Sequence, residues 1–186
     1  MTTFISGILI SNDILKFESQ LPLSLVNGIL VNQKGNIYVG SEFYGKIQSF
    51  DKNGRYICNW NVNSGGGLFK MQLMDNQNIL VVTARGNKKL IYDGTGNLVS
   101  EEIKGNYYYN NVESNKKIYK VGEDEKYEVV GTFFPKIVKS SKTKFQIIVA
   151  QSYLLNIIQA PFPSVIIIAI GVILSIALEF LIVKSL

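Results

Sequence analysis

Apolar and polar residues alternate in short runs through the first three quarters of the chain, and the last quarter is almost wholly apolar. The early runs are rich in Ile, Val, Tyr and Phe, which favour strands. Pairs such as Asn-Gly and Asp-Gly separate them, and these residues suit tight turns. The pattern predicts an all-β domain over residues 1–135, followed by a segment over 136–162 and a helix over 163–186.

The β domain contains an internal repeat with an offset of about 42 residues, the length typical of a four-stranded propeller blade. Asn36–Val39 matches Asn78–Val81, and Phe50–Gly54 matches Tyr92–Gly96. A weaker third copy passes through Lys117–Lys120, where the Asp-x-x-Gly turn is lost. The sequence therefore predicts about three four-stranded antiparallel units that stack as blades, because one such unit cannot bury its apolar faces alone.

The first unit, from Asn36–Val39 through Lys46–Asp51 to Gly54, resembles the NHL-repeat family of β-propellers. The resemblance covers about Asn27–Thr132 and is clear only in the first copy. Gly40 and Ser41 replace the acidic residue that the family usually carries after the second strand. The resemblance implies a fold and no particular activity, because propellers host many unrelated functions.

Three units and an N-terminal hairpin over residues 8–17 are too few for a closed ring, which needs four to eight blades. Three arrangements remain open: an open stack of blades, a ring completed by two or more chains, and a twisted antiparallel sheet with no ring. Because open sheet edges are usually covered or paired, we expect a protein partner or a homo-oligomer.

The run from Pro163 to Val183 is almost unbroken Ile, Val, Leu, Ala and Phe. About 21 residues at ~1.5 Å each span the ~30 Å hydrocarbon layer. This predicts a single-pass, tail-anchored membrane protein whose β domain stays in the cytoplasm. Gly171, Ser175 and Glu179 share one helix face, which predicts a helix–helix contact. The alternative is that Glu179 snorkels to water at the far interface.

Lys136, Lys139, Lys142 and Lys144 crowd together before this helix. They predict a basic patch that faces anionic lipid, or else a solvated strand or loop. Residues 145–160 predict an amphipathic helix lying on the bilayer, with a short inserted helix as the alternative.

The net charge of +5 is too small and too dispersed to indicate a nucleic-acid binder. The chain has no histidine, which removes Ser-His-Asp catalysis and His-ligated metals. The single cysteine, Cys58, allows no internal disulfide and is predicted to be a buried structural thiol. We predict no catalytic, cofactor or metal site and no small-molecule substrate.

Other candidate motifs have structural interpretations. Gly65–Gly67 and Gly94–Gly96 lack the following helix of a phosphate loop and are predicted to be turns. Tyr107–Tyr109 is predicted to alternate across a strand. The leading prediction is thus a membrane-anchored, non-enzymatic protein-interaction module, and the alternative is an accessory subunit of a larger membrane complex. An enzyme using Asp51 or Asp93 is a third hypothesis, disfavoured because both aspartates occupy turn positions.

Overall fold

The structure, a computed structural model, describes residues 18–65, 67–103, 107–132, 134–150, 168–178 and 180. Its main feature is three four-stranded antiparallel sheets, in each of which strands consecutive in sequence are neighbours. Sheet A contains β1 (Val26–Val31), β2 (Ile37–Ser41), β3 (Lys46–Phe50) and β4 (Tyr56–Asn61). Sheet B contains β5 (Phe69–Leu73), β6 (Ile79–Thr83), β7 (Lys88–Tyr92) and β8 (Leu98–Ile103). Sheet C contains β9 (Ile118–Val121), β10 (Glu125–Val130), β11 (Lys136–Ser140) and β12 (Phe145–Val149).

The repeated turns have the structural role that the sequence predicts. In the β3–β4 and β7–β8 turns, one carboxylate oxygen of Asp51 or Asp93 accepts hydrogen bonds from the main-chain N–H groups two and four residues downstream, at 2.8–2.9 Å. Asn32 does the same in the β1–β2 turn. Gly54 and Gly96 close their turns with φ of 83° and 90°, a region that glycine enters without steric cost.

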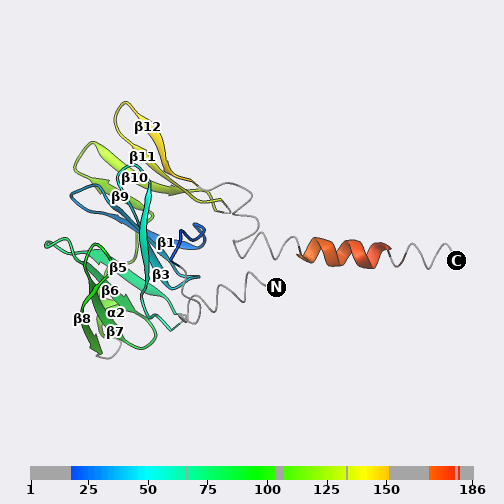
Figure 1. Ribbon diagram of the computed structural model, residues 1–186, viewed down its shortest axis with the longest axis horizontal. Helices are drawn as coiled ribbons and strands as arrows, with labels where there is room; N and C mark the ends of the chain where they lie inside the picture. The colour runs from blue at the N-terminus through cyan, green and yellow to red at the C-terminus, as the bar shows by residue number, and fades with distance from the viewer. Residues whose placement is uncertain are drawn as a thin grey trace.

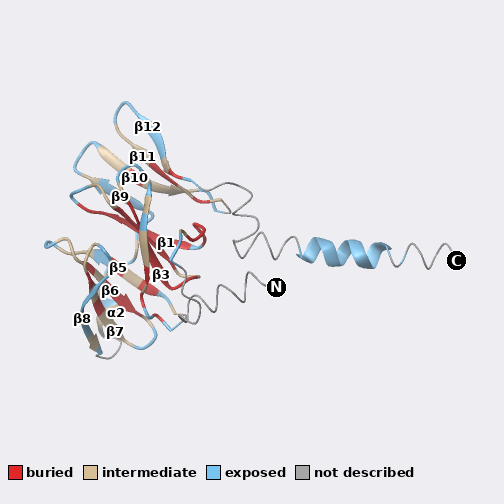
Figure 2. Cartoon of the chain, viewed as in Figure 1, coloured by how far each residue is buried: buried red, intermediate tan, exposed pale blue. Residues whose placement is uncertain are grey.

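Sheet A lies between the other two sheets (Figure 1), so both of its faces are covered. One face packs on sheet B around Tyr38 and Trp60, and the other packs on sheet C around Phe50 and Tyr127. Every residue of β2 and β3 is buried as a result. Figure 2 shows burial concentrated in the middle of the stack and exposure at its two ends.

Turn glycines make the two interfaces possible. A Cβ added to Gly96 in sheet B would lie 2.6 Å from Cε3 of Trp60 on β4. A Cβ added to Gly54 in sheet A would meet the carbonyl oxygen of Ile148 on β12. In both cases the turn between the third and fourth strands of one sheet packs on the fourth strand of the next. The described part of the chain is therefore an open stack of blade-like units in the order B, A, C, with no closed sheet.

Part of this stack comes from residues that the sequence analysis assigned elsewhere. β11 pairs with β10 and β12 pairs with β11, so the boundary predicted at residue 135 falls inside sheet C. The start of the predicted 145–160 helix is strand β12, because cross-strand pairing with β11 takes up its main-chain groups. Residues 151–160 of that helix, and the hairpin predicted over 8–17, lie outside the described residues.

The strand predicted for Tyr107–Tyr109 is also wrong, because these residues begin the helix α2 (Tyr107–Asn111). α2 lies against β6 on the face of sheet B that is turned away from sheet A. The Tyr108 hydroxyl donates a hydrogen bond to Glu102 at 2.7 Å, and Lys70 Nζ donates one to the Tyr109 carbonyl at 2.8 Å. The contact with Lys70, 39 residues away, is not visible in the local sequence pattern, which is why that pattern does not indicate this helix.

The prediction of a membrane-spanning helix needs correction. Residues 168–178 and residue 180 are helical and exposed. Within the described ranges, no helix has the length and apolar character needed to cross a bilayer. This finding overturns the predicted single-pass, tail-anchored location with a cytoplasmic β domain.

Candidate functional site

The carboxylates and the thiol that the sequence singled out have structural roles. Hydrogen bonds from Thr95 and Asn97 hold the pKa of Asp93 well below its usual range, and a bond from Arg55 N–H lowers that of Asp51. The half-buried Cys58 lies with Sγ 3.5 Å from the Thr95 carbonyl oxygen, and burial raises its thiol pKa. Among the described residues, no group of three or more His, Cys, Asp or Glu side chains is placed to hold a metal.

The four predicted lipid-facing lysines do not lie on one surface. Lys136 and Lys139 are three positions apart on β11, so their side chains leave opposite faces of the sheet. Lys139 pairs with Glu125 at 2.7 Å, and Lys142, in the β11–β12 turn, pairs with Asp124 at 2.5 Å. Lys144 is exposed in the same turn.

The predicted helix–helix stripe is only partly described. Gly171 and Ser175 lie in the 168–178 helix with exposed side-chain positions, and a Cβ added to Gly171 would meet no atom within 4 Å. Glu179 lies outside the described residues. Nothing in the structure tests a helix–helix contact at these positions, so it stays a prediction.

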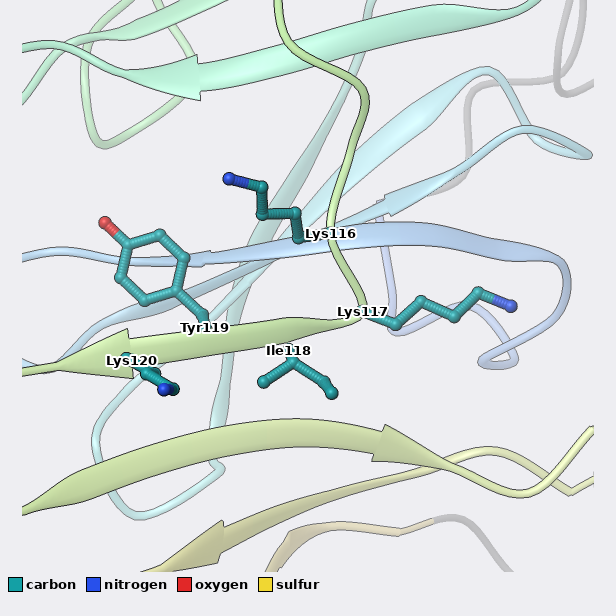
Figure 3. A pocket seen from close by; sticks show the side chains of 5 residues that line it. All are labelled: Lys116, Lys117, Ile118, Tyr119 and Lys120. Carbon is teal, nitrogen blue, oxygen red and sulfur yellow. The ribbon is translucent and has the colours of Figure 1, made fainter.

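One hollow in the described part of the chain follows β9. It has a volume of about 680 Å³ and runs along Lys116–Lys120, and Figure 3 shows Tyr119 and Ile118 on opposite sides of this strand. β9 is an edge strand whose only neighbour in sheet C is β10. The hollow therefore lies beside a strand that has one side unpaired.

The segment before β9 holds this edge in place. The Asn115 side chain bridges two main-chain groups of β5: its Oδ1 accepts from Met71 N at 2.8 Å, and its Nδ2 donates to the Phe69 carbonyl at 2.9 Å. The carbonyl oxygen of Lys116 accepts from Ile29 N on β1 at 3.0 Å. β9 therefore begins at a point anchored to both other sheets, which makes the edge a well-defined surface.

The orientation of the β9 main chain follows from its pairing. Val129 on β10 lies opposite Lys117, and its N–H donates a hydrogen bond to the Lys117 carbonyl at 2.8 Å. Because antiparallel pairs alternate between hydrogen-bonded and non-hydrogen-bonded positions, the main-chain N–H and C=O groups of Ile118 and Lys120 point away from β10. Within the described residues no main-chain hydrogen bond engages these groups, although β1 reaches this side of the strand at Lys116, where Ile29 N donates to the carbonyl oxygen.

A second, smaller cavity of about 220 Å³ adjoins this edge on the side of sheets A and B. Lys116 and Tyr119 line both spaces. The apolar part of its lining comes from β1 and β5, namely Ile29, Leu30, Met71 and Leu73. The edge of β9 thus has an apolar recess on its inner side.

Most of the net positive charge lies in sheet C. Residues 116–149 contain eight lysines and four acidic residues, a balance of +4 out of the +5 of the whole chain. Lys117 and Lys120 flank Ile118 and Tyr119 in the hollow, and both lysines are exposed. Within the described part of the chain, neither forms an ion pair. The edge therefore offers two cations around two apolar side chains.

Sequence reasoning missed this site. It treated Lys117–Lys120 only as a degenerate repeat and sought basic charge between residues 136 and 144. The available signal was the Lys-Ile-Tyr-Lys order itself, in which charge flanks apolar residues on a short strand. The Lys-Ile-Tyr-Lys order indicates a binding site only once the strand is known to lie at the edge of a sheet.

Comparison with known proteins assigns no family. No family model and no curated protein matches the chain, so the NHL resemblance is unconfirmed. Similar solved structures include a streptogramin B lyase (15% identity, TM-score 0.40) and the virginiamycin B lyase of Staphylococcus aureus (13% identity, TM-score 0.40). The matches cover 74% and 73% of this chain but only 45% of each lyase, so the chain spans less than half their length.

These comparisons correct one prediction. The solved structures that resemble the chain are lyases, hence enzymes, which overturns the prediction that the chain is non-enzymatic. At these identities and TM-scores the resemblance transfers no activity or substrate to this chain.

Proposed function

We propose that this protein is a protein-interaction module and that sheet C is its binding element. The observation that carries the proposal is the open edge of β9, which lies beside a hollow of about 680 Å³. An unpaired edge strand presents main-chain donors and acceptors to another chain. Partners commonly exploit such an edge by adding a strand to the sheet.

Exposed apolar side chains beside a hollow support this choice. Both ends of the stack expose apolar side chains: Leu98, Val99 and Ile103 on β8 are 49–68% exposed, and Ile118, Phe145 and Ile147 in sheet C are 43–70% exposed. In sheet C the edge strand β9 also lines the hollow of about 680 Å³, together with the exposed lysines Lys117 and Lys120. Proteins seldom leave both an edge and apolar side chains uncovered on one sheet without a partner for them.

The repeat supports a finer proposal, that the three sheets are NHL-type blades. The Asp51–Gly54 and Asp93–Gly96 turns have the same hydrogen bonds and the same packing role in successive sheets. A second copy of the chain would be one way to extend such a stack, so a test of the function has to distinguish a self-partner from a foreign one.

Site-specific photo-crosslinking in the native host tests the function. A benzophenone amino acid at Lys120 lies on the β9 edge, and the same residue at Val99, 58% exposed on β8, is the matched control. We expect a reproducible covalent protein adduct from position 120 that is absent from position 99, identified by mass spectrometry. An adduct with a second copy would make the partner the chain itself. Equal labelling from both positions, or none, would contradict the proposal.

A further inference from the structure

We infer, on the basis of the proposed function, that the partner contributes an extended segment that adds as a strand beside β9. The partner's segment has a defined sequence pattern: an acidic residue, two apolar residues and a second acidic residue in direct succession. The pattern follows from the main chain, the side-chain alternation and the recess behind the strand.

The main-chain part rests on two residues. Ile118 and Lys120 direct their N–H and C=O groups away from β10, so an added strand can form hydrogen bonds with both. These bonds are independent of the partner's side chains and give affinity without specificity. At about 3.3 Å per residue, four partner residues cover Lys117, which directly precedes β9, and the first three residues of β9.

Specificity comes from the alternation of side chains along β9. Lys117 and Tyr119 face the inner side of the sheet, and Ile118 and Lys120 face the outer side. Side chains directly opposite one another on neighbouring strands lie about 4.5–5.5 Å apart at Cβ and interact as pairs. Partner residues opposite Lys117 and Lys120 are therefore acidic, and those opposite Ile118 and Tyr119 are apolar.

The inner apolar position has a defined destination. The residue opposite Tyr119 points toward the 220 Å³ cavity, whose walls include Leu30, Met71 and Leu73. A valine or isoleucine side chain suits a cavity of this size and lining, whereas a charged one would lose its hydration there. The outer apolar position lies beside Ile118, which is 43% exposed and gains burial from it. The order of the four residues reads the same in both directions, so parallel and antiparallel addition require the same pattern.

Fluorescence anisotropy with the full-length chain tests this inference. The probe is a fluorescein-labelled peptide in which Glu-Val-Val-Glu is flanked by Ser-Gly pairs, and its matched control is Val-Glu-Glu-Val with the same flanks, composition and charge. We expect the first peptide to bind at least tenfold more tightly than the control. Equal affinities would show that charge alone attracts the peptide and would overturn the inference.

Two variants of the chain test the charge and main-chain contributions separately. Replacing both Lys117 and Lys120 by Glu should reverse the preference, so that Lys-Val-Val-Lys binds more tightly than Glu-Val-Val-Glu. Lys120→Pro removes an N–H that is not used by β10 and should weaken Glu-Val-Val-Glu binding at least tenfold. Lys144→Gln, which removes one charge in the β11–β12 turn outside the hollow, should leave that affinity unchanged. If the chain with Glu at both positions 117 and 120 still binds Glu-Val-Val-Glu more tightly than Lys-Val-Val-Lys, the inference is refuted. This result does not depend on whether the proline variant folds.

Failure of this inference and failure of the proposed function give different results. If position 120 captures a partner but the two peptides bind equally, the protein is an interaction module that does not use strand addition. If position 120 captures nothing and neither peptide binds, both the function and the inference are wrong.

Discussion

Replacing Gly96 by alanine should destabilise the packing of sheet B on sheet A. Gly96 has φ of 90°, and an added Cβ would lie 2.6–2.9 Å from three carbons of the Trp60 indole. The indole has little freedom to move away. It is 8% exposed and lies between the rings of Tyr38 and Tyr92, whose centres are 6.2 and 6.0 Å away.

The expected magnitude has two parts. A left-handed backbone costs an L-residue about 1–2 kcal/mol. Forcing a methyl group into a packed site costs about 1–3 kcal/mol more. The total of about 2–5 kcal/mol is a large part of the 5–15 kcal/mol that holds a typical domain folded.

A matched control separates the two parts. Gly122, in the β9–β10 turn, has φ of 65°, and a Cβ there would meet no atom within 4 Å. Gly122→Ala should therefore carry only the backbone cost. The difference in the free energy of unfolding between the two variants should be about 1–3 kcal/mol, which measures the overpacking at the interface.

Urea unfolding followed by the emission of Trp60, the only tryptophan in the chain, provides the measurement. Both variants should unfold with the m-value of the parent chain, so that the shift in midpoint reports stability. If Gly96→Ala loses no more stability than Gly122→Ala, the turn does not pack on the indole, and the order of the sheets in the stack is wrong.

Three further changes have defined outcomes. Because the pKa of Asp93 is lowered in the folded chain, its stabilisation is present above the unfolded value of about 3.9 and is lost as the pH falls below it. The urea midpoint of the parent should thus fall more steeply between pH 5 and 3 than that of Asp93→Asn, and equal slopes would contradict the assignment. Because burial raises the thiol pKa of Cys58, a disulfide reagent at pH 8 should react much faster in urea than with the folded chain; equal rates would show an exposed, reactive thiol. Asn115→Ala removes two hydrogen bonds to β5 and should lower the free energy of unfolding by about 1–3 kcal/mol, whereas an unchanged midpoint would mean that this anchor is dispensable.

The turns were predictable from the sequence because their chemistry is local. The Asp51 and Asp93 side chains bond to main-chain groups at most four residues away, so the residues needed for each turn are adjacent in the chain. The strands on either side follow from their composition for the same reason. The all-β class and the count of about three units came from this local information.

Sheet C was misassigned where its strands depend on distant partners. Lys136–Ser140 is rich in charge, and its place in a sheet depends on pairing with β10 and on the ion pair between Lys139 and Glu125. Neither is visible in a local window. Tyr107–Tyr109 was misassigned for a similar reason, since its helix is held in part by hydrogen bonds from the distant Lys70 to the carbonyls of Tyr109 and Val112.

The sequence by itself determined the strands of sheets A and B, the repeat and the turns, because each depends on residues close together in the chain. The tertiary structure decided that sheet A lies in the middle, that α2 covers one end of the stack, and that β9 keeps an open edge. The candidate site belongs to this second group. The same four residues, Lys117–Lys120, would be ordinary strand residues if another strand paired with them. They form a candidate binding edge only because no strand pairs with the outward main-chain groups of Ile118 and Lys120, which lie beside a recess lined by residues from β1 and β5.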